Sequence, residues 1–367
     1  MANKKFTVLI YTLGTIGESV YTTIDKLADL FDLKSNLRIL VGKFSTNLNV
    51  RLKTLIDQYG FKELVVPDDK VSKFSQLFPN MQIIRVTQAI AKADYIIDCT
   101  KKGEENVPLY GDKPHVLQGS EVLPTHQKFI GTINADKVLD ADKITCLSCN
   151  SHATAGVIAP LLKYLDDLFV IYVRRAGDPG DEKGIPGTHL EKPAHGSFGC
   201  HQIEDPWVLF QEEGLVKEHQ VASGVALKVS NNFTHTLICK MKLSAEGKTQ
   251  LGGTNERIRD AITKIFEKEP MVGFTGEFDS NIITEHGRRR GWIAGGWGQY
   301  AFLNPETIHV TDNSVSFSAF VLQDRNVCID NAYLVIARAQ QTLGKPVISF
   351  SDFVTKMVEA GLIPKWV

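Results

Sequence analysis

Hydrophobic and polar positions divide the chain into two halves with different periodicities. In the first half, short apolar runs rich in β-branched residues alternate with segments whose apolar residues have helical spacing. The first run, residues 6–10, leads through a glycine-containing turn into a helical pattern from Ile16 to Phe31. We expect strands at residues 6–10, 37–41, 63–66, 82–86, 95–98, 116–118, 128–131 and 144–148. Strands that alternate with helices predict a parallel, doubly wound Rossmann sheet.

The second half follows mainly a strand period. Residues 168–173 form an unbroken apolar run, and residues 236–243 alternate apolar with polar side chains, as in a sheet with one solvated face. Residues 308–311 and 315–321 flank a polar turn and predict a hairpin. The segment 177–206 is rich in Gly, Pro and His, so we expect a long loop there.

Two C-terminal segments, residues 331–339 and 351–360, have helical spacing and are expected to pack back on the first half. Together the patterns predict an α/β plus α+β protein. In this prediction a dinucleotide-binding Rossmann domain spans residues 1–148 and is completed by residues 331–367. A catalytic domain with an antiparallel sheet spans residues 149–330.

Composition agrees with two ordinary cores, because 43% of the 367 residues are hydrophobic and 23% are charged. The formal net charge is −1, and no Lys/Arg-rich block is present, so nucleic acid is not an expected partner. The N-terminus runs directly into a strand, and no apolar run is long enough to span a bilayer. We therefore expect a soluble cytoplasmic protein without a membrane partner.

The six cysteines are too sparse for a disulfide framework in a chain of this length. Cys146 and Cys149 form a C-x-x-C motif, but strand alternation sends them to opposite faces, so we expect Cys146 to be a packed core residue. The histidines and cysteine between residues 189 and 201 match no standard zinc spacing. No metal site is expected.

Cys149 lies where a predicted strand ends and a helix should begin. A cysteine at a helix N-terminus meets unpaired backbone N–H groups and the positive end of the helix dipole, which favour the thiolate. This position indicates a nucleophile. His235 could accept its proton, while His152 is a rival because it lies three residues later on the same helix face.

A turn at residues 11–17 aligns with the dinucleotide fingerprint G-x-G-x-x-G, except that Thr12 replaces the first glycine. Gly14 would let the backbone approach a pyrophosphate, and Gly17 would let the helix pack close to the sheet. A plain tight turn is the alternative reading. The candidate cofactor-binding residues are Thr12, Gly14, Thr15, Ile16 and Gly17, with Thr100 after a later strand.

The end of the second strand lacks the acidic residue that usually binds the ribose of NAD. Lys43, Ser45 and Thr46 stand there instead, and they would suit the 2′-phosphate of NADP. We therefore favour NADP, with NAD possible. Lys43 as a solvated loop lysine is the competing interpretation.

Arg174 and Arg175 directly follow a buried strand. Two planar guanidinium groups at a strand end could clamp a phosphate or carboxylate. A salt bridge with Asp178, on the surface or at a subunit interface, is the alternative, and spacing does not separate the two.

The order of four short motifs resembles the archaeal-type (type II) glyceraldehyde-3-phosphate dehydrogenases over most of the chain. These motifs are Gly14-Thr-Ile-Gly17, Gln118-Gly119, Ser148-Cys149-Asn150 and Val173-Arg-Arg-Ala-Gly-Asp-Pro179. The family's members are tetramers with a Rossmann domain, an antiparallel catalytic domain and a C-terminal helix returned to the first domain. Many accept or prefer NADP.

The resemblance implies a role for each matching residue. Cys149 would be the nucleophile and His235 the strand-borne base, with Asn150 beside them. Arg174 and Arg175 would line the substrate-phosphate region, and Gln118 and Gly119 the cofactor region.

Five residues at three sites depart from the family pattern. Ser151 and His152 replace two threonines after the nucleophile, Asn231 and Asn232 replace two threonines before the histidine, and Thr12 replaces a glycine. The first four remain candidates for phosphate binding.

The resemblance thus implies a phosphorylating aldehyde dehydrogenase that acts on a small aldehyde and inorganic phosphate and assembles as a homo-oligomer, by resemblance a tetramer. Cys149 would form a thiohemiacetal, His235 would move its protons, and the N–H groups of Cys149 and Asn150 would stabilise the oxyanion. Hydride transfer to the nicotinamide would leave a thioester for phosphate or water to cleave. Two alternatives stay open: a semialdehyde dehydrogenase or acyl-phosphate reductase on a carboxylate substrate, and a nucleotide-binding redox sensor that oxidises Cys149.

Overall fold

The computed structural model describes residues 5–46, 50–119, 123–175, 189–190, 196–229, 234–289, 298–322 and 326–367. The chain divides into two compact units. Unit 1 comprises Met1–Phe129, Asp136–Cys146 and Cys328–Ser349, and unit 2 comprises Ile130–Ala135, Leu147–Val327 and Phe350–Val367.

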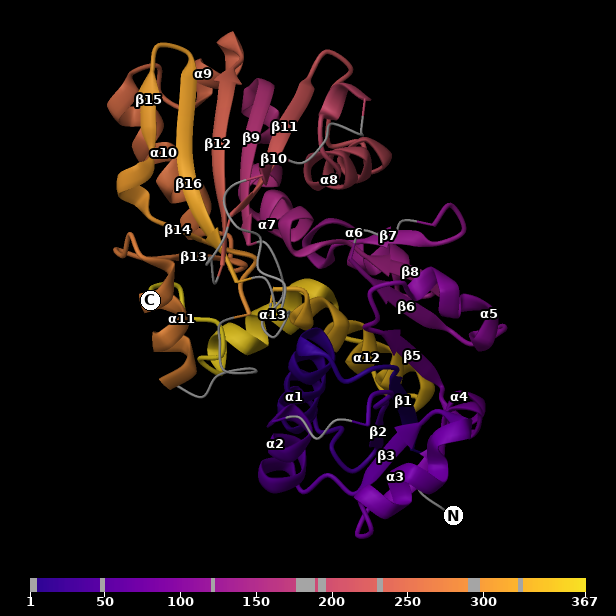
Figure 1. The fold of residues 1–367 in the computed structure, drawn as a ribbon. Coiled ribbons are helices and arrows are strands. Elements are labelled where there is room, and N and C mark those ends of the chain that lie inside the picture. Colours follow the sequence, from indigo (N-terminus) through magenta and orange to yellow (C-terminus); the bar gives the residue numbers. More distant parts are fainter. Residues whose placement is uncertain are drawn as a thin grey trace. The chain divides into compact units, whose positions relative to one another are not determined.

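Unit 1 alternates strands with helices (Figure 1). Its elements are β1 (Phe6–Ile10), α1 (Thr15–Leu30), β2 (Leu37–Val41), α2 (Val50–Tyr59), β3 (Glu63–Val66), η1 (Asp68–Lys70), α3 (Val71–Leu77), β4 (Gln82–Arg85), α4 (Val86–Lys92), β5 (Tyr95–Asp98), η2 (Gly103–Asn106), α5 (Val107–Tyr110), β6 (His115–Gln118), β7 (Gln127–Phe129), β8 (Lys143–Cys146) and α12 (Cys328–Thr342), while α6 (Gly131–Val138) begins in unit 2 and ends in unit 1.

Among the described residues, six strands form a wholly parallel sheet in the order β2-β1-β5-β6-β8-β7. A second parallel pair, β3 and β4, continues beyond β2 through a bridge between Gly42 and Val65. The chain thus moves outward from β1 through β4 and returns to β5 on the other side of β1. This confirms the predicted doubly wound Rossmann sheet, and its topological switch point lies between β1 and β5.

Helix α12 belongs to unit 1, where it packs on α1. Its buried Asn331 exchanges two hydrogen bonds with Gln118 at the end of β6, with Nε2 of Gln118 donating at 2.7 Å and Nδ2 of Asn331 donating at 3.0 Å. The next helix, α13 (Phe350–Glu359), belongs to unit 2.

Unit 2 is built around a second sheet (Figure 1). Its further elements are α7 (Cys149–Ile158), η3 (Ala159–Tyr164), β9 (Leu165–Arg175), β10 (His189–Leu190), η4 (Gly196–Phe198), α8 (His201–Glu212), β11 (Val221–Val229), β12 (His235–Leu243), α9 (Ala245–Gln250), α10 (Asn255–Glu267), β13 (Val272–Phe274), α11 (Ser280–Arg289), β14 (Ala301–Leu303), η6 (Pro305–Thr307), β15 (His309–Thr311) and β16 (Ser314–Val321). No helix in the described parts of the chain has the length and apolarity needed to cross a membrane.

This second sheet runs in the order β10-β11-β9-β12-β16-β14-β13, with β15 paired to β16. The central strands β9, β12 and β16 are antiparallel, and β15 with β16 forms the expected hairpin. However, β11 pairs parallel to β9, and β13 pairs parallel to β14. In both cases a helix, α8 or α11, connects the two strands, and such a crossover is what a parallel pair requires. The sheet is therefore mixed.

Part of the expected loop at residues 177–206 is helical, because α8 begins at His201 and contains Pro206. Proline lacks the N–H that would bond the carbonyl four residues earlier, which is that of Gln202. The hydroxyl of Tyr172 donates to this carbonyl at 3.1 Å instead. A tertiary contact thus allows proline inside a helix that composition alone does not predict. Residues 176–188 and 191–195 lie outside the described residues.

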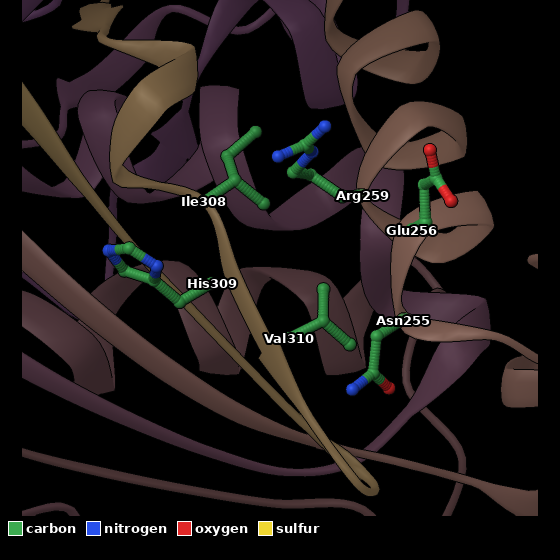
Figure 2. Close-up of a pocket in the computed structure, with 6 residues that line it drawn as sticks. All are labelled: Asn255, Glu256, Arg259, Ile308, His309 and Val310. Atoms are coloured by element: carbon green, nitrogen blue, oxygen red, sulfur yellow. The ribbon is translucent and has the colours of Figure 1, made fainter.

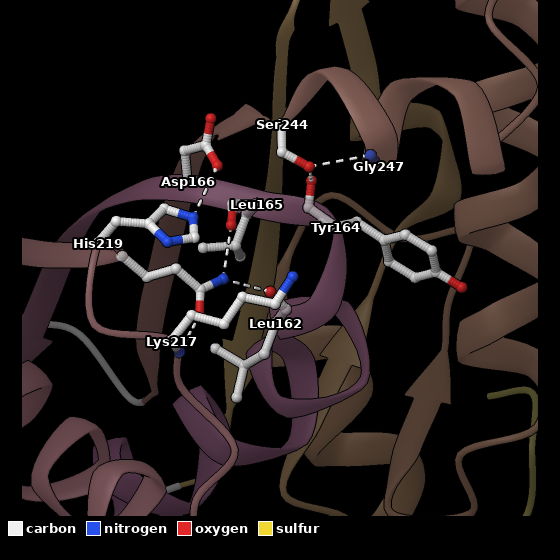
Figure 3. A network of polar contacts seen from close by, with 9 residues as sticks. Leu162, Tyr164, Leu165, Asp166, Lys217, His219, Ser244 and Gly247 are labelled. Atoms are coloured by element: carbon white, nitrogen blue, oxygen red, sulfur yellow. Dashed lines mark hydrogen bonds and ion pairs between the residues drawn. The ribbon is translucent and has the colours of Figure 1, made fainter.

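A buried glutamine, Gln220, connects backbone segments at the start of β9, the end of the strand opposite Arg175. Figure 3 shows its partners Leu162, Leu165 and Lys217. The Nε2 of Gln220 donates to the carbonyl oxygens of Leu162 at 2.6 Å and Leu165 at 2.5 Å, and its Oε1 accepts from the backbone of Lys217 at 2.7 Å. All of these partners are backbone groups, so the side chain acts as a structural connector between η3, β9 and the segment before β11.

Two buried histidines in unit 1 predict a loss of stability in acid. Nε2 of His115 and Nε2 of His126 are 2.9 Å apart, so only one proton fits between them. Burial lowers the pKa of His115, and burial together with repulsion from His115 and Lys143 lowers the pKa of His126 to about 4. Because both values lie below that of an unfolded histidine, the associated stability is full above about pH 6.5 and is lost as the pH falls towards 4.

We expect the free energy of unfolding in urea to fall by about 2 kcal/mol between about pH 7 and pH 5 through His126 alone. The charged groups that act on the pair are Lys143, Asp98 and Asp142. His126→Gln should flatten this pH dependence, and an equally steep dependence in that variant would contradict the assignment.

Candidate active site

Helix α7 begins at Cys149, at the position predicted from the sequence. Ser148 is its N-cap, and the Ser148 Oγ accepts a hydrogen bond from the backbone N–H of Ser151 at 3.3 Å. The Oγ atoms of these two serines are 2.9 Å apart. Cys149 is half-buried and forms no disulfide with any of the other five cysteines, all of which the structure describes. Its thiol therefore lies in the field of the first helical turn, which favours the thiolate.

The structure brings together three residues predicted to act in catalysis. The Sγ of Cys149 is 3.9 Å from Nδ1 of His235, the first residue of β12. The same Nδ1 is 3.0 Å from Oδ1 of Asn150. A carboxamide oxygen only accepts hydrogen bonds, so Nδ1 carries the proton in this arrangement. A protonated Nδ1 at this distance can donate to a thiolate on Cys149.

Backbone donors at the start of α7 lie next to the nucleophile. The N–H of Ser151 is used by the Ser148 cap, and His152 N–H bonds the carbonyl of Ser148 at 2.9 Å. The N–H of Asn150 makes no hydrogen bond to any described residue. Donors without a partner in the first turn of a helix can bind an anion, including an oxyanion formed on Cys149.

His152, the rival base, is buried one turn further along α7. Its Nδ1 is 3.0 Å from the carbonyl oxygen of Ser148, and its ring meets that of Tyr300 edge to face at 5.0 Å. The carbonyl accepts, so Nδ1 is the protonated nitrogen. The other candidate, His235, has its Nδ1 3.9 Å from the nucleophile's sulfur.

Arg174 lies near the end of β9, at the same end of the sheet as His235. Register pairs Val173 with Thr236, the residue after His235. By alternation, Arg174 shares a face with Tyr172, whose hydroxyl is 2.7 Å from Thr154 of α7. The guanidinium of Arg174 is therefore on the face that carries the cysteine helix. The Arg175 side chain, Asn231 and Asn232 lie outside what the structure describes.

In unit 1 the predicted fingerprint turn joins β1 to α1 at the topological switch point. Gly14 is the N-cap of α1, and open space surrounds the position where a Cβ atom would lie. At Gly17 a Cβ atom would lie 2.1 Å from the carbonyl oxygen of Thr12, so this position requires glycine for close packing. Thr12, Thr15 and Ile16 are half-buried around this turn. The turn thus leaves room for a ligand at Gly14 and is tight at Gly17.

Lys43, at the end of β2, is 2% exposed rather than solvated. Its Nζ donates to Oγ of the exposed Ser45 at 2.7 Å, and Thr46 is half-buried beside it in the chain. Burial lowers the pKa of Lys43, and no carboxylate of a described residue pairs with it. A second cation, Lys70, donates from Nζ to the carbonyl oxygen of Phe44 at 3.1 Å. Lys70 follows a different strand, β3, so its position in the sequence does not predict that it lies near Lys43.

Thr100 is held at the carboxyl end of β5 by the buried carboxylate of Asp98. Oδ1 of Asp98 accepts from the backbone N–H of Thr100 at 2.8 Å and from its hydroxyl at 2.7 Å. Oδ2 accepts from the hydroxyl of Tyr110 at 2.6 Å, and burial with the nearby carboxylate raises the pKa of Tyr110. The side chain of Gln118 is hydrogen-bonded to that of Asn331. The half-buried Gly119 has a positive φ of 96°.

A surface cavity of about 420 Å³ lies elsewhere in unit 2, between α10 and β15 (Figure 2). It is lined by Asn255, Glu256, Arg259, Ile308, His309 and Val310. The polar residues among these are exposed, and none belongs to the elements that carry Cys149 and His235. Within the described residues, no group of three or more His, Cys, Asp or Glu side chains could hold a metal ion.

The chain is similar in sequence to several archaeal proteins named glyceraldehyde-3-phosphate dehydrogenase. It is 29% identical over 351 residues to that of Methanopyrus kandleri, a match that covers 91% of this chain and 92% of the relative. With the protein of Thermococcus sibiricus it shares 29% over 206 residues, which covers 52% of this chain and 57% of the relative. With that of Halobacterium salinarum it shares 29% over 177 residues, covering 45% and 51%.

A scan against models of known protein families finds no match. Full-length similarity to the Methanopyrus protein, the Rossmann sheet and the cysteine and histidine pair nevertheless agree with one another. Over most of its length, the chain is similar to the archaeal-type glyceraldehyde-3-phosphate dehydrogenases.

Proposed function

We propose that this protein is a phosphorylating glyceraldehyde-3-phosphate dehydrogenase. The observation that carries the proposal is the 3.9 Å approach of Cys149 Sγ to His235 Nδ1 at the N-terminus of α7. A cysteine nucleophile beside a base suits aldehyde oxidation through a covalent thiohemiacetal and thioester. The shared name of the archaeal relatives supports the choice of substrate.

The reaction begins when the Cys149 thiolate adds to the aldehyde carbon. The carbonyl electrons move to oxygen, and the N–H groups of Cys149 and Asn150 stabilise the resulting negative charge. Protonated at Nδ1, His235 pairs with the thiolate before attack, gives that proton to the oxyanion to form the thiohemiacetal hydroxyl, and takes it back as hydride leaves. The bound nicotinamide cofactor supplies the hydride acceptor. Inorganic phosphate then cleaves the thioester and releases Cys149 with an acyl phosphate as product.

Arg174 is the described cation best placed to bind the substrate phosphate. Its position on the α7 face of the sheet, at the end where His235 begins β12, supports this role. Ser151 and His152 are buried in α7 beside the nucleophile. They stand where the family pattern has two threonines, so the path of inorganic phosphate is a part of the site that departs from that pattern.

The direct test is an assay of the purified protein with glyceraldehyde 3-phosphate, NADP and inorganic phosphate. We expect NADPH to form only when all three are present. Aspartate semialdehyde in place of the sugar phosphate tests the alternative carboxylate substrate, and its preferential oxidation would overturn the proposal. Product formation without inorganic phosphate would show that water cleaves the thioester.

We propose NADP as the preferred cofactor. A buried ammonium group without a carboxylate partner, as at Lys43, has its charge uncompensated and is suited to bind an anion. The 2′-phosphate of NADP is the anion that a site at the end of β2 would meet. The open space at Gly14 and the tight contact at Gly17 fit a pyrophosphate at the start of α1.

Lys43→Glu is expected to change cofactor choice. A hydrogen bond to a charged group contributes about 1.5–3 kcal/mol, so the ratio of kcat/KM for NADP to that for NAD should fall by roughly 10- to 100-fold. Lys43→Gln separates loss of the cation from addition of a negative charge and should give a smaller fall. Lys92→Glu, on the exposed end of α4, is the control for net charge. An unchanged NADP to NAD ratio in both Lys43 variants would contradict the assignment.

We also propose that the protein assembles as a homotetramer. One face of the unit 2 sheet carries exposed apolar side chains, among them Phe169 (38% exposed), Val225 (38%) and Ile238 (39%). Register places all three on the face opposite Tyr172 and α7. An apolar sheet face open to solvent is typical of a subunit interface. Native mass spectrometry of the purified protein measures the stoichiometry.

A further inference from the structure

Asn326 follows β16 and is fully buried. Its Nδ2 donates to the carbonyl oxygen of Cys149 at 2.7 Å and to that of Tyr300 at 3.2 Å. Because both partners only accept hydrogen bonds, the amino group of the amide must face them. Oδ1 is buried and accepts no hydrogen bond from a described residue. The whole donor capacity of this side chain is thus directed at two backbone carbonyls, one of which belongs to the nucleophile.

The Cys149 carbonyl and the Asn150 N–H belong to one peptide group. That group is planar, and in a trans peptide its C=O and N–H point in opposite directions. A hydrogen bond that holds the carbonyl therefore also holds the direction of the N–H. The Asn150 N–H is the donor that makes no bond to a described residue and lies beside the reacting sulfur.

The second partner anchors this contact to a rigid part of unit 2. Tyr300 is fully buried directly before β14, and its N–H donates to the carbonyl of Met271 at 2.8 Å. Asn326 therefore connects the first turn of α7 to the entry of a buried strand. A connection of this kind resists rotation of the Cys149–Asn150 peptide when charge develops beside it.

We propose that Asn326 is a positioning residue that aims the Asn150 N–H at the oxyanion formed on the carbon bound to Cys149. The proposal rests on the proposed function of Cys149 as a nucleophile. The proposal predicts different effects on two reactions of the Cys149 thiolate. Attack on an ester carbonyl forms an S–C bond, moves the carbonyl electron pair to oxygen and then expels the alcohol, so it needs the oxyanion donor. Displacement of iodide from iodoacetamide forms an S–C bond without any oxyanion.

The experiment compares p-nitrophenyl acetate with iodoacetamide on Asn326→Leu, with peptide mass spectrometry to follow Cys149 and Cys149→Ser to measure background. We expect acetylation of Cys149 to slow by roughly 10- to 100-fold, because loss of one oxyanion donor costs about 10²- to 10³-fold and misdirection costs less. Alkylation should stay within about twofold, since it needs only the thiolate.

Gln220→Leu is the matched control. Gln220 is a buried amide that also donates to two backbone carbonyls, but its partners are Leu162 and Leu165 in η3 and β9 (Figure 3). Gln220→Leu should lose about as much stability as Asn326→Leu and keep the native rates of acetylation and alkylation of Cys149.

Acetylation at the native rate in Asn326→Leu, or an equal slowing of both reactions, would overturn the proposal. Should the leucine variant not fold, Asn326→Asp has nearly the same shape and replaces the donor by an acceptor, and the same fall in the ratio of rates is expected. Neither probe requires NADP or an aldehyde. A protein inactive towards glyceraldehyde 3-phosphate would therefore refute the proposed function and still give a measurable ratio.

Discussion

Cys149→Ser is expected to lower aldehyde oxidation by roughly 10⁴-fold or more, as loss of a nucleophile does in comparable enzymes. The reason lies in the acidity of the attacking group. A thiol at a helix N-terminus ionises near neutral pH, whereas a serine hydroxyl there stays protonated and would need a much stronger base than His235. The measurement is single-turnover formation of NADPH from glyceraldehyde 3-phosphate.

The affinity for NADP should change little in this variant, because the candidate cofactor-binding residues lie in unit 1 and Cys149 lies in unit 2. Cys239→Ala is the matched control. Cys239 is a fully buried cysteine on β12, the strand that carries His235, so its loss should reduce stability and preserve turnover. Substantial activity in Cys149→Ser would end the nucleophile assignment and favour a mechanism without a covalent intermediate.

His235→Asn is the second substitution with a large expected effect. General acid–base catalysis contributes about 10²- to 10⁴-fold, so kcat should fall within that range at neutral pH. Because hydroxide can deprotonate the thiol when the imidazole is absent, the residual rate should rise with pH where the native rate is level. Alkylation of Cys149 by iodoacetamide should slow as well, since that reaction follows the thiolate.

The control for this variant is His309→Asn, which changes an exposed histidine of β15. Wild-type dependence of kcat on pH in His235→Asn would contradict the assignment and leave His152 as the base. His152→Asn, with its hydrogen bond to the Ser148 carbonyl removed, then becomes the decisive comparison.

Much of the fold could be predicted because its strands are short apolar runs with clear boundaries. β1, β2, β3 and β5 occupy the residues expected for them. Strand β11 was not predicted, because its small and apolar side chains do not follow a clear two-residue period. The parallel pairs of unit 2 were also missed. Their direction depends on the crossovers through α8 and α11, and α8 contains a proline that Tyr172 makes tolerable.

Some features of the candidate site could likewise be predicted from the sequence, and others could not. The position of Cys149 at the start of a helix follows from local sequence, and so does the glycine turn at residues 11–17. Burial of Lys43 does not follow from its neighbours in the chain, which predict a loop as readily as a cofactor site. Asn326 carried no sequence signal, because its partner Cys149 is 177 residues away.

The sequence by itself determined which segments become strands and helices, where the nucleophile stands and which family the chain resembles. These properties depend on local periodicity, on helix capping and on short motifs, all of which are written within a few adjacent residues. Only the tertiary structure decided that His235 reaches Cys149, that His152 turns to the Ser148 carbonyl, and that Asn326 holds the reacting peptide. Such contacts join residues distant in the chain, and their geometry is set by strand register and side-chain packing rather than by local sequence.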